Sequence, residues 1–237
     1  MVHRKEHFRT IVLVYCALLF CTIVLCLSSP ALSQKLTEED GLIESIGAVS
    51  FLLASLTFFT AALRQKKGRF RLWWFLLLAL FCFLAFGEEI SWGQRLIGFD
   101  SPNFFLQWNF QKETNIHNMA WISGFDEKGQ DLPWWGKILT AGRMFTLASF
   151  TFCVFIPIGV SRCSWLAEKT ESWRLPRSPL VLSWLFLTNY CFFRLALLFQ
   201  NNQVHDLNEI KEAWYALAWL IVAISIWKKE KTAPSTS

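Results

Sequence analysis

Six long apolar runs limit the fold of this chain more than any other feature. A helix that crosses the hydrocarbon core of a bilayer needs about 20 mostly apolar residues, and runs of this kind cover residues 10–28, 42–63, 72–91, 138–160, 179–200 and 209–227. Hydrophobic residues make up 54% of the sequence, which is too apolar for an ordinary soluble domain. We therefore expect an all-α polytopic transmembrane bundle of six helices, built as one transmembrane domain over residues 1–237.

The first apolar run has two possible interpretations. It follows the basic residues Arg4, Lys5 and Arg9, and residues 31–33 resemble the cleavage site of a secretory signal. The apolar stretch over residues 11–27 is longer than the roughly 7 to 15 residues of a signal core. We expect a retained helix, and removal of this segment stays open as the alternative.

Successive connections between the runs alternate in charge. The N-terminus, the second and fourth connections and the C-terminus together hold 15 basic residues and four acids. The other connections hold six basic residues and 14 Asp and Glu. Because cytoplasmic segments of membrane proteins are enriched in Lys and Arg, we expect both termini of this multi-pass protein to lie in the cytoplasm.

The outer connection between the third and fourth spans, residues 92–137, is patterned. Asp100, Ser101 and Pro102 are typical of a helix start, with a capping side chain and a proline at the first helical position. Aromatic and aliphatic residues then alternate with polar ones over residues 104–110. This pattern predicts a short interfacial helix that lies in the membrane surface beside the bundle.

Ionisable residues at the edges of apolar runs are costly, so each needs a partner or a function. Asp40 and Glu44 share one face at the start of the second span. Asp40 is either a helix-capping residue or part of a site, whereas Glu44 lies deeper and is the better candidate for a site. Glu88 and Glu89 close the third span just beneath the outer boundary, where adjacent carboxylates are expensive.

The Glu88 and Glu89 pair has a structural and a functional interpretation. Arg143 and Arg194, near the outer ends of their own spans, are possible partners for ion bridges. In the functional interpretation the two carboxylates belong to a site on the outer face. Both interpretations stay open at this stage.

Residues 109–118 combine several amides with one carboxylate and one imidazole. On a helix, Glu113 and His117 share one face. Such a segment is either well solvated or lines a polar cavity, and its many ligand-type side chains favour the cavity. The residues concerned are Asn109, Gln111, Glu113, Asn115, His117 and Asn118.

The last span begins with a fourth polar cluster. His205, Glu209 and Glu212 are spaced so that one helical face carries all three. A polar helix start with acids near the positive end of the dipole explains Glu209 well and His205 poorly. All four clusters fall on the outer side of a topology that was derived without them.

The four clusters together predict one carboxylate and histidine site. Candidate ligands for a divalent metal, either Zn, Mn, Fe or Mg, are His117, His205, Glu209 and Glu44. Glu88 and Glu113 are candidates for a catalytic general base. The residues expected to support the site or orient a substrate are Glu89, Gln94, Asn109, Gln111, Asn115, Asn118, Arg143, Arg194 and Glu212.

Two segments resemble a group of uncharacterised bacterial multi-pass membrane proteins. They are FGEEISWGQR at residues 86–95 and NFQKETNIHN at residues 109–118, and the resemblance covers spans two to four best. It implies a bacterial inner membrane location and no particular activity. A looser likeness is to seven-helix metal hydrolases that include the alkaline ceramidases, from which this chain differs by its six spans and two usable outer histidines.

Three functions are compatible with these patterns. The leading hypothesis is a metal-dependent hydrolase or transferase acting on a lipid-linked substrate in the bilayer. The second is an ion-coupled transporter with a relay through Glu44, Glu88 and Arg194, and the third is a non-catalytic assembly or interaction protein. Orientation explains the inner basic residues, so no nucleic-acid partner is expected.

Overall fold

The structure, a computed structural model, describes residues 2–38, 41–65, 68–109, 111–124, 130, 132–133, 136–199 and 204–232, without the side chains of residues 2–5, 95, 204, 205 and 232. Within this described part, six helical spans are long and apolar enough to cross a membrane: Glu6–Ser28, Leu42–Leu63, Arg69–Glu89, Ala141–Arg162, Leu180–Phe199 and Asp206–Lys231. The prediction of an all-α bundle with six spans is therefore confirmed.

The spans are formed by α1 (Val2–Ser28), α3 (Leu42–Leu63), α4 (Arg69–Glu89), α8 (Ala141–Phe150) with η2 (Thr151–Phe155) and α9 (Ile156–Arg162), η3 (Leu180–Leu182) with α11 (Ser183–Phe199), and α12 (Val204–Thr232). The shorter elements are α2 (Pro30–Thr37), η1 (Ser91–Gly93), α5 (Gln94–Ile97), α6 (Asn103–Trp108), α7 (Ala120–Ser123) and α10 (Ser164–Ser172). The predicted short helix of the outer connection is α6, whereas α2 and α10 fall in segments that were expected to be loops.

The start of α6 differs from the prediction in one detail. Pro102 is the residue before the helix rather than its first residue, and no side chain caps the helix. The Ser101 hydroxyl instead donates to the carbonyl of Lys112 at 2.6 Å. This bond draws the start of α6 toward the following loop.

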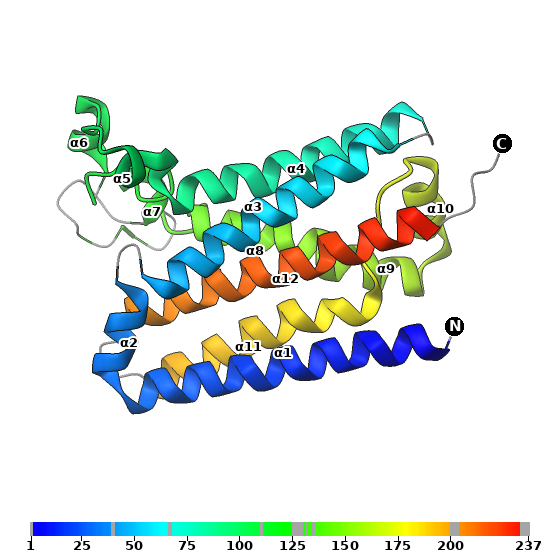
Figure 1. The fold of residues 1–237 in the computed structure, drawn as a ribbon, viewed down its shortest axis with the longest axis horizontal. Coiled ribbons are helices and arrows are strands. Elements are labelled where there is room, and N and C mark those ends of the chain that lie inside the picture. The colour runs from blue at the N-terminus through cyan, green and yellow to red at the C-terminus, as the bar shows by residue number, and fades with distance from the viewer. Residues whose placement is uncertain are drawn as a thin grey trace.

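Helix α3 lies in the middle of the bundle, between α4 and α12, and α11 packs between α12 and α1 (Figure 1). Lipid tails are as apolar as the helices, so close van der Waals packing of small residues contributes much of the association energy. At the contact of α3 with α12, a Cβ atom added to Gly47 would lie 3.3 Å from the Cα atom of Ala213. Glycine at position 47 therefore allows the two backbones to approach.

Trp219 is the largest fully buried side chain and joins most of the spans. Its indole N–H donates to the Ser149 hydroxyl at 3.0 Å, which satisfies the one polar atom of the ring. Its ring centroid lies 5.1 to 6.4 Å from those of Phe58, Phe81, Phe152 and Phe186. The aromatic residues thus fill the space between α12 and the helices around it.

The fourth span is irregular near Pro157. Proline lacks an N–H group and clashes with the carbonyl four residues earlier, which belongs to Cys153. The backbone widens to a π-helix over Thr151–Phe155, and the Ser183 hydroxyl of α11 donates to the Cys153 carbonyl at 2.7 Å. A neighbouring side chain therefore replaces the hydrogen bond that proline removes, as the interior of a bilayer requires.

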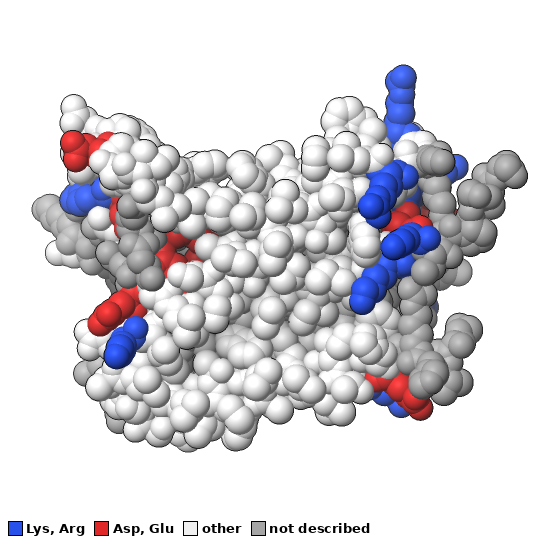
Figure 2. Space-filling view, in the orientation of Figure 1, with Lys and Arg blue, Asp and Glu red and all other residues white. Residues whose placement is uncertain are grey.

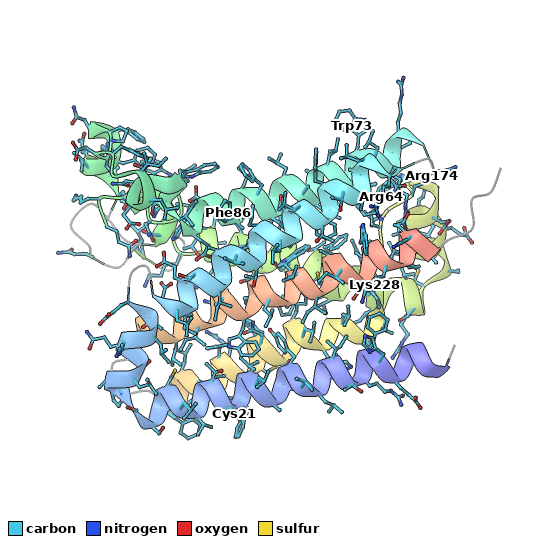
Figure 3. The ribbon with its side chains drawn as sticks, in the orientation of Figure 1. Cys21, Arg64, Trp73, Phe86, Arg174 and Lys228 are labelled. Atoms are coloured by element: carbon cyan, nitrogen blue, oxygen red, sulfur yellow. The ribbon has the colours of Figure 1, made fainter. Side chains whose placement is uncertain are left out.

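Charge divides the molecule into two ends. Lys and Arg gather mostly where α1 begins and α12 ends, and Asp and Glu mostly at the opposite end (Figure 2). Arg64, Arg174 and Lys228 all lie at the basic end (Figure 3). We call the basic end the inner end and the acidic end the outer end, because the charge pattern predicts these positions across a membrane.

Polar contacts fasten the helices at the inner end. The Arg71 guanidinium pairs with Glu230 of α12, with its Nε 3.0 Å from the carboxylate, and also donates to the Arg174 carbonyl at 3.0 Å. The Trp74 indole N–H donates to the Trp173 carbonyl at 3.0 Å. These bonds hold the segment after α10 against α4 and α12.

The predicted orientation can be tested with single-cysteine variants. The first variant retains Cys163, which is exposed at the inner end, and the second carries Gln130→Cys in the outer connection, with the other cysteines replaced by Ala in each. We expect a membrane-impermeant maleimide to label residue 130 in intact cells and Cys163 only after permeabilisation. Labelling in the reverse order would show that the charge-based orientation is wrong.

Candidate functional site

Several parts of the chain meet around one small cavity of about 40 Å³ at the outer end. They are α2, α3, the end of α4, the loop after α6 and the start of α12. The cavity is lined by Thr37, Glu44, Glu88, Glu89, Gln111, Glu113, Asn115, His117, Asn118, Glu209 and Glu212. The described lining thus has six glutamates and one histidine, without Lys or Arg. The structure brings together residues from all four predicted clusters.

The carboxylate of Glu88 fastens the loop to the end of α4. The Trp92 indole N–H donates to Oε1 at 2.8 Å, and the backbone N–H groups of Ile116 and His117 donate to Oε2 at 2.6 and 2.8 Å. Nδ1 of His117 lies 3.3 Å from the same Oε2. An ionised carboxylate has about four acceptor sites, so this occupancy favours a structural role for Glu88 over the predicted general base.

The chain reverses direction directly after α4. Ser91 and Trp92 have φ angles of 47° and 54°, which lie in the left-handed region that side chains other than glycine rarely adopt. The reversal lays the Trp92 ring over Gly87, where an added Cβ atom would lie 2.9 Å from three ring atoms. Gly87 therefore allows the indole to reach the Glu88 carboxylate.

The loop after α6 is organised by Asn109, which is 1% exposed. Its Oδ1 accepts the backbone N–H groups of Gln111 and Glu113 at 2.9 and 3.3 Å, and its Nδ2 donates to the carbonyl and to Oδ1 of Asn115, both at 2.8 Å. Asn side chains compete for the backbone groups that a helix would use. The described residues between 109 and 118 therefore form a loop, closed by a bridge between Asn109 and Met119, rather than a helix on which Glu113 and His117 would share a face.

Glu113 is the most buried acid of the described cavity lining, at 9% exposure. Its Oε2 accepts the Ser91 hydroxyl at 2.5 Å and the Asn115 Nδ2 at 2.9 Å. Gln94 supports the same loop, because its Oε1 accepts the backbone N–H of Thr114 at 2.7 Å. Asn115 and Gln94, which the sequence singled out as supporting residues, thus hold the loop against the turn that follows α4.

The close contact of α3 with α12 positions the other acids. Glu44 precedes Gly47 by one turn on α3, and Glu209 and Glu212 precede Ala213 within one turn on α12. Because Gly47 and Ala213 meet, the two helix starts bring these three carboxylates to the same cavity. Lys211 Nζ lies 3.8 Å from Glu212 Oε1 beside the cavity lining.

Arg143 and Arg194, two residues of the sequence prediction, are not among the described cavity-lining residues. Arg143 donates to the Lys137 carbonyl, and the Arg194 guanidinium lies 5.9 Å from the centre of the Tyr190 ring. Neither contact is the ion bridge to Glu88 that the structural interpretation allowed, because the partners of Glu88 described above are groups of Trp92, Ile116 and His117. Asp40 lies outside the described residues, and so does the side chain of His205.

One further contact between lining residues and two residues that the sequence analysis missed complete the site. The side chains of Gln111 and Asn118 hydrogen-bond to each other across the loop. Ser91 and Trp92 bind the two structural glutamates, yet the sequence showed them only as a serine and an interfacial aromatic. The spacing of residues in the sequence does not indicate the left-handed turn that directs these two side chains inward.

His117 pairs with Glu88 through Nδ1, which leaves Nε2 as the ring nitrogen not bonded to that carboxylate. Burial acts to lower the pKa of His117. The hydrogen bond from Glu88 and the negative charges of Glu212, Glu88 and Glu209 outweigh burial, so the pKa lies above its ordinary value. The protonated imidazole is therefore favoured in the folded protein.

The described residues contain no group of three or more His, Cys, Asp and Glu arranged to hold a metal ion. Of the four predicted ligands, Glu44, His117 and Glu209 line the cavity without forming such a group. The described carboxylates thus make an acidic cavity rather than a closed coordination shell.

Replacement of Asn109 by Ala should loosen the loop. The substitution leaves buried N–H groups without an acceptor, and we expect a stability loss of about 2 to 4 kcal/mol. Thermal denaturation and limited proteolysis after α6 provide the measurement. Gln107→Ala, on the exposed face of α6, is the matched control; equal protease resistance in both variants would contradict the role given to Asn109.

The raised pKa of His117 predicts a pH-dependent contribution to stability. A raised pKa means that the contribution is fully present below the ordinary value of about 6.5 and is lost as pH rises through the folded value. With a chelator present, the melting temperature of the wild type should exceed that of His117→Gln more at pH 5.5 than at pH 8.5. His7→Gln, exposed on α1, is the control, and a difference that grows with pH would contradict this account.

Comparison with protein-family models gave no match, and comparisons with curated proteins and with solved structures gave none either. The site is interpreted from its own residues.

Proposed function

We propose that this integral membrane protein binds a hydrated divalent cation in the outer cavity and uses it as a hydrolase or transferase on a lipid-linked substrate. The observation that carries the proposal is the meeting of six carboxylates from three helices and a loop around one cavity. Carboxylates that line one small cavity repel one another when ionised, and a bound cation offsets this repulsion.

The carboxylates divide into two groups with different roles. Glu88 and Glu113 accept hydrogen bonds from N–H and O–H donors and hold the loop in place. Glu44, Glu209 and Glu212 come from the starts of two packed helices and also line the cavity. In the proposal these three acids attract the cation.

The size of the cavity limits the kind of cation. A volume of about 40 Å³ has room for a small ion and water, and it is too small for an organic head group. Zn²⁺ sites use three or four direct protein ligands, a set that the described residues lack. Mg²⁺ keeps several waters and needs only one or two carboxylates together with substrate phosphates, so Mg²⁺ or Mn²⁺ fits best.

A pair of residues could move protons in such a reaction. Glu88 orients the His117 ring through Nδ1, and carboxylates commonly fix histidine in this way at catalytic and metal sites. We assign the general acid or base to Nε2 of His117, with Glu88 as its positioning residue. Glu113 stays the second candidate for the base.

The substrate class follows from two exposed aromatic residues of the same outer connection. Phe104 and Trp121 are 53% and 54% exposed on α6 and α7, and their ring centroids lie 5.8 Å apart. Exposed aromatic residues at a membrane boundary favour contact with lipid. A lipid-linked phosphate would meet the cation at the cavity while its chain stays in the bilayer.

The alternative functions receive less support. A transport relay through Glu44, Glu88 and Arg194 is not favoured, because Arg194 lies against Tyr190 and away from the described lining. An assembly or interaction protein is favoured by the hydrogen-bond network around Glu88 and Asn109, which is structural in character. Cation binding distinguishes this alternative from the proposed enzyme.

Mn²⁺ binding followed by electron paramagnetic resonance tests the proposal. We expect the purified wild type to bind one Mn²⁺ that Mg²⁺ displaces. Glu44→Gln and Glu209→Gln should weaken the Mn²⁺ affinity by roughly 10- to 100-fold, as for residues that hold a metal through its waters. Glu38→Gln, exposed just after α2, is the control and should bind like the wild type; a wild type without bound Mn²⁺ would overturn the proposal.

A further inference from the structure

A second and larger cavity of about 370 Å³ lies at the inner end, far along the bundle from the acidic one. Its walls come from α1, α9, α12 and the segment that leads into α11. Phe8, Val160 and Leu180 form part of its apolar surface, and Arg177 and Lys229 are its two described cations. Its volume falls within the range of about 300 to 1,000 Å³ found for ligand pockets.

The kink in the fourth span helps to form this cavity. Pro157 lies in the first turn of α9, just after the π-helix Thr151–Phe155, and itself lines the cavity. Beyond it, α9 continues for less than two turns before the chain turns into α10. The cavity therefore lies where α9 and α12 reach the inner boundary.

Part of the cavity wall belongs to membrane-spanning segments. Leu180, one of its lining residues, is the first residue of the fifth span, and 47% of its surface is exposed. In a membrane that surface is covered by acyl chains. A long apolar ligand can enter from the bilayer without leaving it, whereas a soluble ligand would find mostly apolar walls.

The cations stand at the polar side of the cavity. Arg177 Nη2 lies 2.6 Å from Oε2 of Glu171, whose side chain is 74% exposed. That contact uses one of the five N–H donors of the guanidinium, and a solvent-exposed ion pair of this kind contributes little and exchanges readily. Lys229 sits at the inner end of the α12 span.

We propose that the inner cavity binds an anionic phospholipid of the inner leaflet. An acyl chain occupies the apolar part, and the phosphate lies between Arg177 and Lys229. Basic pockets between spanning helices at the cytoplasmic boundary suit anionic head groups, and each nearby cation adds to the attraction. The proposal is independent of the cation site at the outer end, because the two cavities share no lining residue among those described.

The test measures thermal stabilisation of the delipidated protein in mixed micelles. Phosphatidylglycerol should raise the melting temperature in a saturable way, and phosphatidylcholine should not. Arg177→Gln combined with Lys229→Gln should raise the half-saturating phosphatidylglycerol fraction by roughly 25-fold, since each cation near an anionic head group contributes a factor of about five. Native mass spectrometry should show one retained phosphatidylglycerol in the wild type and its loss in the double variant.

Three controls keep the result specific. Arg69→Gln combined with Lys169→Gln removes the same charge from exposed inner positions outside the cavity and should leave the half-saturating fraction unchanged. Ser225→Leu fills the cavity without changing charge and should weaken lipid binding while size-exclusion chromatography shows an intact protein. Inorganic phosphate should not reproduce the stabilisation.

Two outcomes would overturn the proposal. The first is that the Arg177→Gln and Lys229→Gln double variant keeps the preference for phosphatidylglycerol, or that the control pair weakens it equally. The second is full stabilisation by inorganic phosphate, which would indicate an ion site without a role for the acyl chain.

Discussion

The absence of water in the bilayer interior is the constraint on which this structure depends. Every backbone N–H and C=O group inside the hydrocarbon must be bonded within the protein, and helices meet this requirement at least cost. Pro157 breaks the rule at one carbonyl, and Ser183 of the neighbouring helix restores the bond. Irregular backbone with many polar side chains is found instead beyond the outer ends of the spans.

In that outer region, side-chain oxygens accept backbone N–H groups that would bond to backbone carbonyls in a helix or a sheet. Glu88 and Asn109 each accept two backbone N–H groups, so one carboxylate and one amide hold a loop that has no regular structure of its own. Removing either acceptor leaves two backbone donors unpaired, and for a buried donor such as the N–H of Glu113 this costs more than the bond itself contributes. The chemistry of the cavity therefore rests on acids and amides whose first task is to hold the backbone.

Hydropathy predicted the spans because a helix that crosses the hydrocarbon core must be apolar along its length. Charge predicted the orientation because Lys and Arg are enriched in cytoplasmic segments. The second span matches its predicted ends, and α6 lies where the aromatic pattern placed a helix. The structure of the loop after α6 could not be predicted, since helical spacing cannot show that the Asn109 side chain captures the N–H groups. The meeting of Glu44 with Glu209 depends on the contact of Gly47 with Ala213, which no local pattern reveals.

Helix α12 links the two cavities of the molecule. Its first turns carry Glu209 and Glu212, and its last turns carry Ser225 and Lys229. The two cavities differ in size, polarity and charge. The small polar cavity among acids suits an ion, and the large apolar cavity beside cations suits a lipid. Because α12 packs along α3 through small residues, enlarging Ala213 would shift the acids at one end and strain the packing toward the other. Side-chain changes at the cavity walls therefore separate the two sites more cleanly than changes along the helix contact.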